Sequence, residues 1–140
     1  MTLSDAIAAY NLLASAHLTQ MAAEDKFVVV KACRALRPFA LDFDEMRADT
    51  IIRLRGDEHD RLAAIAEQRL PADPAELRAA QAYMHDYGES VARCLTQELD
   101  RLAPIALPRL GEAAFEALVA SNDYDVKTII LLQDLLTDVS

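Results

Sequence analysis

Residues 6–23 form a run of eighteen positions without Asp, Glu, Lys or Arg, although 26% of the chain is charged. A helix with no charged face must be enclosed by its own protein or covered by a partner. Crossing a membrane is excluded because five polar side chains would be costly in lipid, namely Asn11, Ser15, His17, Thr19 and Gln20. A secretory signal is also excluded, since no basic residue precedes the run and its apolar core is interrupted.

We therefore predict a covered helix that begins near Ser4, because serine accepts hydrogen bonds from the free amides of a first turn. Apolar residues recur at steps of three and four from Leu3 to Met21, which places them on one helix face. The residues of this face that are predicted to make contacts are Tyr10, Leu13 and Leu18.

Composition favours one helical domain in a reducing compartment. A chain of 140 residues suits a single domain and buries a core without disulfides or metal. Its three glycines and five prolines permit few tight turns, which favours long helices over sheets joined by hairpins. Cys33 and Cys94 have no nearby cysteine partner, so we interpret them as small buried apolar residues of a cytoplasmic protein.

Two long helices are predicted to form the frame of the fold. The first, 24–56, keeps its apolar period across Pro38, which favours one kinked helix that ends at Gly56. A shorter helix is predicted over 57–70. The second long helix, 74–102, starts at the strong capping sequence Asp73-Pro74-Ala75-Glu76. Its seven-residue apolar rhythm resembles a bundle seam, and the seam residues predicted to make contacts are Met84, Tyr87 and Val91.

The C-terminal part is predicted to form a helical hairpin, with arms over 112–120 and 125–136 joined by a turn at 121–123. The only plausible strand, 105–107, has no partner strand. The sequence thus predicts an all-α fold, a bundle of four to six helices with two long antiparallel helices. It forms a single domain over 1–140, with the hairpin region 104–140 packed on the bundle.

Carboxylates offer one possible catalytic site. Asp42, Glu45 and Asp49 follow one another at steps of three and four on one helix face. All-α nucleoside-triphosphate pyrophosphohydrolases bind Mg²⁺ through two such acidic pairs on facing helices, because Mg²⁺ prefers hard oxygen ligands. Here the second pair is poor, and acids spaced along a helix usually form its solvated side. The prediction is therefore no cofactor and no metal, with this enzyme class as the alternative.

Three other groups are weaker candidates for a functional site. The dipeptides His59-Asp60 and His85-Asp86 are a fragment of the ligand set of helical metal-dependent phosphohydrolases, which need further ligands than these helices carry. The segment 121–125 alternates oxygens like a calcium loop but lacks its glycine and glutamate, so a turn and a helix cap explain it. The stripe of Lys31, Arg34 and Arg37 suits a phosphate, a partner's acidic patch or the chain's own carboxylates, the last being the ordinary explanation.

The order of segments resembles a group of short helical proteins encoded in phage and prophage clusters of gut bacteria. The resemblance is carried by residues 3–10, by the Leu36-Arg37-Pro38 bend followed by Phe43, and by a closing segment, Phe115-x-x-Leu118-x-x-Ser121-Asn122-Asp123. It implies a virion-assembly or accessory role, and no functional residue is transferred from it.

Together these observations predict a non-enzymatic protein that binds a protein partner or associates with itself, for instance as a homodimer. The same surfaces satisfied inside one monomer are nearly as well supported. The net charge of −9 argues against nucleic acid and anionic membranes and favours a basic partner. A small regulator that binds a basic protein is a third hypothesis.

Overall fold

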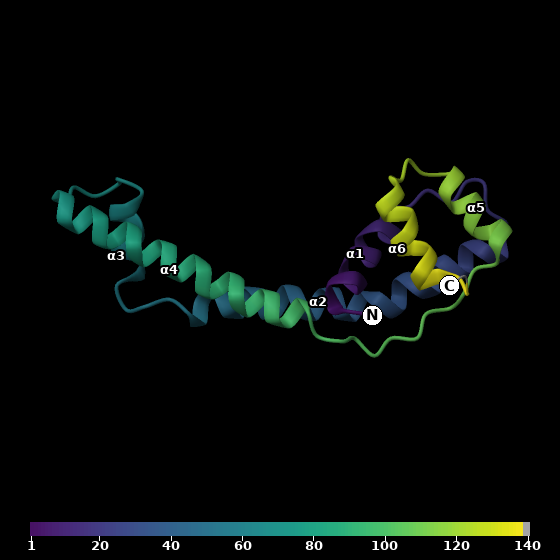
Figure 1. The fold of residues 1–140 in the computed structure, drawn as a ribbon, viewed down its shortest axis with the longest axis horizontal. Helices are drawn as coiled ribbons and strands as arrows, with labels where there is room; N and C mark the ends of the chain where they lie inside the picture. The colour runs from purple at the N-terminus through teal and green to yellow at the C-terminus, as the bar shows by residue number, and fades with distance from the viewer. Residues whose placement is uncertain (139–140) are drawn as a thin grey trace. The chain divides into compact units, whose positions relative to one another are not determined.

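The computed structural model describes residues 1–138, and within them the chain forms six helices and no strand. The all-α class predicted from the sequence is confirmed (Figure 1). In chain order the helices are α1 (Leu3–Ala14), α2 (Ala23–Arg53), α3 (His59–Ala66), α4 (Pro74–Leu99), α5 (Glu112–Ala120) and α6 (Val126–Leu136). The two long helices α2 and α4 and the hairpin α5–α6 stand where the sequence placed them.

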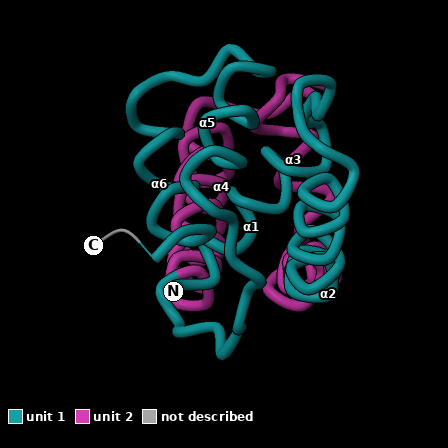
Figure 2. Tube along the Cα trace, turned by 90° about the vertical axis from the view of Figure 1, so that its right-hand side faces the viewer, with its two compact units in different colours: residues 1–43, 100–140 teal, residues 44–99 magenta. Residues whose placement is uncertain are grey.

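The contacts of the chain group it into two compact units (Figure 2), and the single domain over 1–140 stays a prediction. The first unit comprises Met1–Phe43 and Asp100–Ser140, and the second comprises Asp44–Leu99. Helix α2 contributes residues to both units and continues through Pro38 as one helix.

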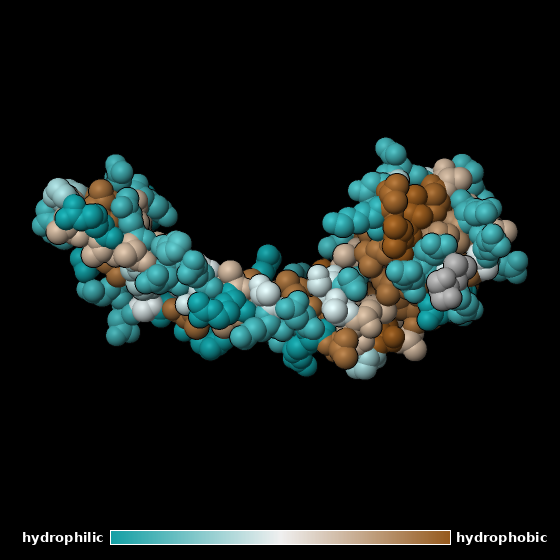
Figure 3. All heavy atoms as spheres, viewed as in Figure 1, coloured by the Kyte–Doolittle hydropathy of each residue, from teal (hydrophilic) through white to brown (hydrophobic). Residues whose placement is uncertain are grey.

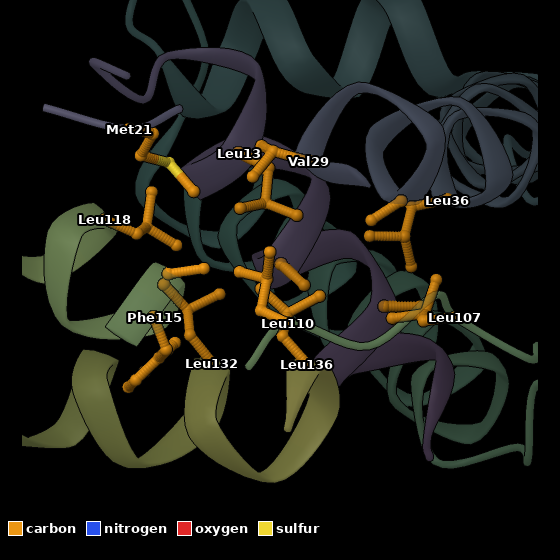
Figure 4. Packing of buried hydrophobic residues seen from close by; sticks show 14 of the residues in the cluster. Leu13, Met21, Val29, Leu36, Leu107, Leu110, Phe115, Leu118, Leu132 and Leu136 are labelled. Carbon is orange, nitrogen blue, oxygen red and sulfur yellow. The ribbon is translucent and has the colours of Figure 1, made fainter. Parts of the chain in front are cut away.

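The first unit is built around a core of leucines from three helices (Figure 4). Leu36 of α2, Leu118 of α5 and Leu132 of α6 are completely buried, and Leu136 is 1% exposed. Helix α1 adds small side chains to this core and Leu13, while the extended segment before α5 adds Leu107 and Leu110. Burial of large side chains of this kind stabilises a fold by about 1.5 to 3 kcal/mol each, so this core fixes how the helices pack.

Helix α1 is shorter than predicted, because it ends at Ala14 and residues 15–22 form a loop with no α-helix. Its cap is Thr2, whose hydroxyl accepts the Asp5 amide proton at 3.1 Å, rather than Ser4. The loop is fixed by distant side chains: the His17 amide donates to Asn122 Oδ1 at 2.8 Å. These tertiary hydrogen bonds stop the helix before the end of the uncharged run.

The second unit packs α3 against α4 with few fully buried side chains. Ala80 of α4 is completely buried and Ile65 of α3 is 3% exposed. Polar aromatic contacts supply much of the remaining packing: Tyr83 Oη accepts the Gly56 amide proton at 3.0 Å and lies 2.8 Å from His59 Nδ1. The ring of His59 also meets the ring of Tyr87 edge-on, with centroids 4.6 Å apart. Within this unit α3 is shorter than the predicted helix 57–70.

Helix α4 starts as the sequence predicts. Asp73 Oδ1 accepts the Glu76 amide proton at 2.8 Å, and Pro74 is the first helical residue. The helix ends at Leu99 rather than near residue 102. Beyond its end the backbone is held in an isolated bridge, because the Leu3 amide donates to the Arg101 carbonyl and the Ala103 amide donates to the Met1 carbonyl.

The Asp73 cap gives a pH-dependent contribution to stability. The hydrogen bond from the Glu76 amide lowers the pKa of Asp73 below its ordinary value of 3.8. A carboxyl whose pKa is lowered by folding stabilises the fold above its ordinary pKa, and this contribution is lost as the pH falls through the lowered value. We therefore expect Asp73→Asn to be less stable than wild type at neutral pH, and the difference to shrink below about pH 3.8.

Urea midpoints of both proteins at neutral pH and at about pH 2 to 3 measure this difference. The control is Asp44→Asn, a change at an exposed residue inside α2 that caps no helix. A wild-type advantage over Asp73→Asn that stays constant across this range would contradict the assignment of the cap.

Candidate functional site

The contact residues predicted on the first helix are covered within their own unit. Leu13 is 5% exposed and belongs to the core, and Tyr10 and Leu18 are half-buried against it. The apolar face of the uncharged run is therefore part of the core of the first unit, whereas its polar side chains Asn11, Ser15, His17, Thr19 and Gln20 are exposed.

The contact residues predicted on α4 are also partly covered. Met84, Tyr87 and Val91 are half-buried, and the Tyr87 hydroxyl donates to the Ile51 carbonyl at 2.6 Å. Tyr87 also stacks on Tyr83 at a ring-centroid distance of 6.2 Å. Tyr87 therefore contacts Ile51, Tyr83 and His59 within the second unit.

The carboxylates Asp42, Glu45 and Asp49 are all exposed on α2. Within residues 1–138, they join no other acidic, histidine or cysteine side chain in a group compact enough to share a metal ion. In that same range, the one such group is His85, Asp86 and Glu89, exposed on a single turn of α4, where His85 Nε2 lies 3.2 Å from Glu89 Oε1.

The other polar groups singled out in the sequence have structural roles. His59 is engaged by Tyr83, and Asp125 caps α6 by accepting the Thr128 amide proton at 2.8 Å. The two cysteines are free and half-buried. Burial raises the pKa of the Cys33 thiol, although Arg37 opposes this shift, and a raised pKa disfavours the nucleophilic thiolate.

The turn between α5 and α6 holds the loop that follows α1 in place through side-chain hydrogen bonds. Asn122 Oδ1 accepts the His17 amide proton at 2.8 Å, and Asn122 Nδ2 donates to the His17 carbonyl at 2.9 Å. Asn122 Nδ2 also donates to the Leu118 carbonyl at 2.8 Å, and the Gln20 amide donates to Ser121 Oγ at 3.3 Å. The segment 121–125, interpreted from the sequence as a turn and a helix cap, therefore also joins this turn to the loop after α1 through hydrogen bonds.

The basic stripe lies on the outer face of α2. Lys31, Arg34 and Arg37 are exposed, and within the part of the chain that the structure describes none of them has a carboxylate within 4.0 Å. Phe27 and Val30 lie on the same face with exposures of 66% and 42%. The expected internal ion pairs of the stripe are thus not formed, and its charges face solvent beside exposed apolar side chains.

A groove of about 360 Å³ opens between α5 and α6. It has an apolar floor, two carboxylates from adjacent turns of α5, and polar groups from the end of α6. The lining residues are Glu112, Phe115, Glu116, Val119, Ala120, Ile129, Gln133 and Thr137. No basic side chain lines it. On α6, Val126 and Ile130 are 73% and 52% exposed, and hydrophobic residues gather on the surface around α6 (Figure 3).

Sequence reasoning missed this groove because it predicted the helical hairpin without separating the buried side of each arm from the exposed side. In the structure Phe115 and Leu118 face the core, whereas Val119 is half-buried beside the groove. The available signal was the acidic pair Glu112 and Glu116, four residues apart on an otherwise apolar helix.

Within residues 1–138, no helix combines the length and the apolar character that a bilayer crossing requires. Comparison of the chain with protein-family models, with curated proteins and with solved structures gives no match. The candidate site is therefore the α5–α6 groove, which is lined by apolar residues and two carboxylates. It lies on the same unit as the exposed basic stripe of α2.

Proposed function

We propose that the protein is a non-enzymatic interaction or assembly protein that binds a basic, amphipathic helical segment of a protein partner in the α5–α6 groove. The observation that supports this function is the combination of an apolar floor with Glu112 and Glu116 on one wall. An amphipathic helix places an apolar face in such a groove and its charged side chains along the rim.

The charge of the groove selects the class of partner. From Glu112 to Asp138 the chain carries six carboxylates and one basic side chain, Lys127. A surface of one sign attracts a partner of the opposite sign and repels nucleic acid and anionic lipid. The resemblance to phage-encoded helical proteins supports the further proposal that the partner belongs to a virion or an accessory complex.

A synthetic amphipathic helix of leucine and lysine is a direct probe of the groove. We expect its binding, followed by NMR of the intact protein, to shift amide signals of α5 and α6, and its affinity to fall roughly tenfold between about 0.05 and 0.5 M salt. Glu116→Lys should weaken binding, because one wall charge changes from attraction to repulsion. Asp44→Lys makes the same charge change on exposed α2 and is the matched control.

Two results would overturn the proposal. One is an absence of binding to α5 and α6 by the basic helix. The other is release of pyrophosphate from nucleoside triphosphates with Mg²⁺, abolished by Glu45→Gln, which would assign the protein to the enzymatic alternative instead.

A further inference from the structure

We infer that the partner is a second copy of this chain, and that the exposed α2 face formed by Phe27, Val30, Lys31 and Arg34 occupies the α5–α6 groove of that copy. This inference rests on the proposed function and names its partner. The four residues of this α2 face are spaced three and four apart, so they lie on one side of the helix.

One copy cannot place this face in its own groove. Leu36 lies nine positions after Phe27, and at about 100° per residue the two side chains point in opposite directions. Leu36 is completely buried in the core that α5 and α6 help to build. The α2 face is therefore directed away from its own α5 and α6, and only another molecule can supply a groove for it.

The two surfaces are complementary in charge. Residues 27–41 contain three basic side chains and no acidic one, in a chain whose net charge is −9. The groove has two carboxylates and no basic lining residue. Within residues 1–138, Lys31, Arg34, Glu112 and Glu116 form no ion pair at 4.0 Å or less. Each surface thus has charges that the chain itself leaves unpaired and that the other surface can pair.

The two surfaces also match in spacing. From Phe27 to Arg34 and from Val119 to Glu112 the separation is seven residues, or about 10.5 Å along either helix. When α2 and α5 run antiparallel, Phe27 meets Val119 while Arg34 meets Glu112. Lys31 then lies within one residue's rise of Glu116. This register places Phe27 beside Val119 and Arg34 beside Glu112, and it leaves Lys31 close to Glu116.

Phe27 is the anchor of the contact. It is an aromatic side chain with 66% exposure, and the groove of about 360 Å³ is larger than an aromatic ring. Exposed aromatic and arginine side chains that become buried in a pocket dominate the binding energy of protein interfaces. Two copies that exchange these faces reciprocally close into a symmetric pair, in which each supplies one α2 face and one groove.

The test is the solution mass of the intact chain measured by sedimentation equilibrium over a wide concentration range. We expect wild type to reach a mass of two or more chains at sub-millimolar concentration. Arg34→Glu and Glu112→Arg should each weaken association about tenfold, and an equimolar mixture of the two variants should recover it. Phe27→Ser should weaken association at least tenfold. Arg47→Glu, an exposed position of α2 outside this face, should leave the mass unchanged.

Each negative outcome has a separate meaning. A wild-type chain that stays monomeric throughout, although the basic model helix still binds α5 and α6, would overturn the second copy as partner and leave the proposed function intact. A self-association that is unaffected by Phe27→Ser and by both charge reversals would also overturn this contact. All three exposed substitutions leave the core untouched, so loss of folding is checked simply by the helical circular dichroism of each variant.

Discussion

Leu118→Ala is expected to lower the free energy of unfolding by about 3 to 4 kcal/mol, the largest effect of any substitution considered for this chain. Leu118 is completely buried at the centre of the first unit, where its side chain packs with those of Phe115, Leu132 and Met21 (Figure 4). Alanine removes apolar contacts and leaves a cavity that close-packed neighbours fill only partly. Urea unfolding followed by circular dichroism measures the loss as a lower midpoint at similar slope.

The matched control is Leu102→Ala, the same chemical change at a side chain that is 79% exposed. Little transfer energy is lost there, so we expect a change within about 0.5 kcal/mol. A cost below about 1 kcal/mol for Leu118→Ala would contradict its placement in the core. Because Leu118 lies on α5, which forms one wall of the groove, Leu118→Ala should also reduce binding of the basic helix.

Local signals made several elements of the fold predictable from sequence. The start of α4 follows from Asp73 and Pro74, and the start of α6 follows from Asp125, whose side chain caps the helix as expected. Low glycine content and apolar periodicity were sufficient for the all-α class. These features depend on residues within one or two helical turns of each other, and such local interactions can be predicted from the sequence.

The end of α1 could not be predicted because it depends on residues about a hundred positions away. Periodicity alone continues from Ala14 through His17 to Met21, but the His17 amide is held by Asn122. The grouping of the chain into two compact units could not be predicted from the sequence either. The spacing along α4 predicts an apolar face. It does not show how deeply that face is buried, and within α4 only Ala80 is fully buried.

The groove escaped prediction for a related reason. A helical hairpin has two apolar sides when both arms are rich in apolar residues, and sequence does not state which side meets the rest of the core. Leu118 and Leu132 take the inner side, which leaves Val119 and Ile129 at the groove and Ile130 at the surface. The basic stripe was recognised as a feature, but its lack of internal ion pairs required coordinates.

Asn122→Ala is expected to lower the free energy of unfolding by about 2 to 3 kcal/mol, although the residue is only half-buried. The substitution removes both hydrogen bonds to the His17 backbone and the bond to the Leu118 carbonyl. Each such bond contributes about 0.5 to 1.5 kcal/mol net. The two bonds to His17 join the α1–α2 loop to the α5–α6 turn, beside the bond from the Gln20 amide to Ser121.

The control for this prediction is Asn11→Ala, the same change at an exposed residue of α1 whose side chain forms no hydrogen bond within residues 1–138. It should leave stability within about 0.5 kcal/mol of wild type. Hydrogen exchange locates the effect: Asn122→Ala should raise exchange at the amides of His17 and Gln20 far more than in α3 or α4, which belong to the other unit. Equal acceleration in both units would contradict a fastening confined to these loops, because a local link that is broken opens first the segments it joins.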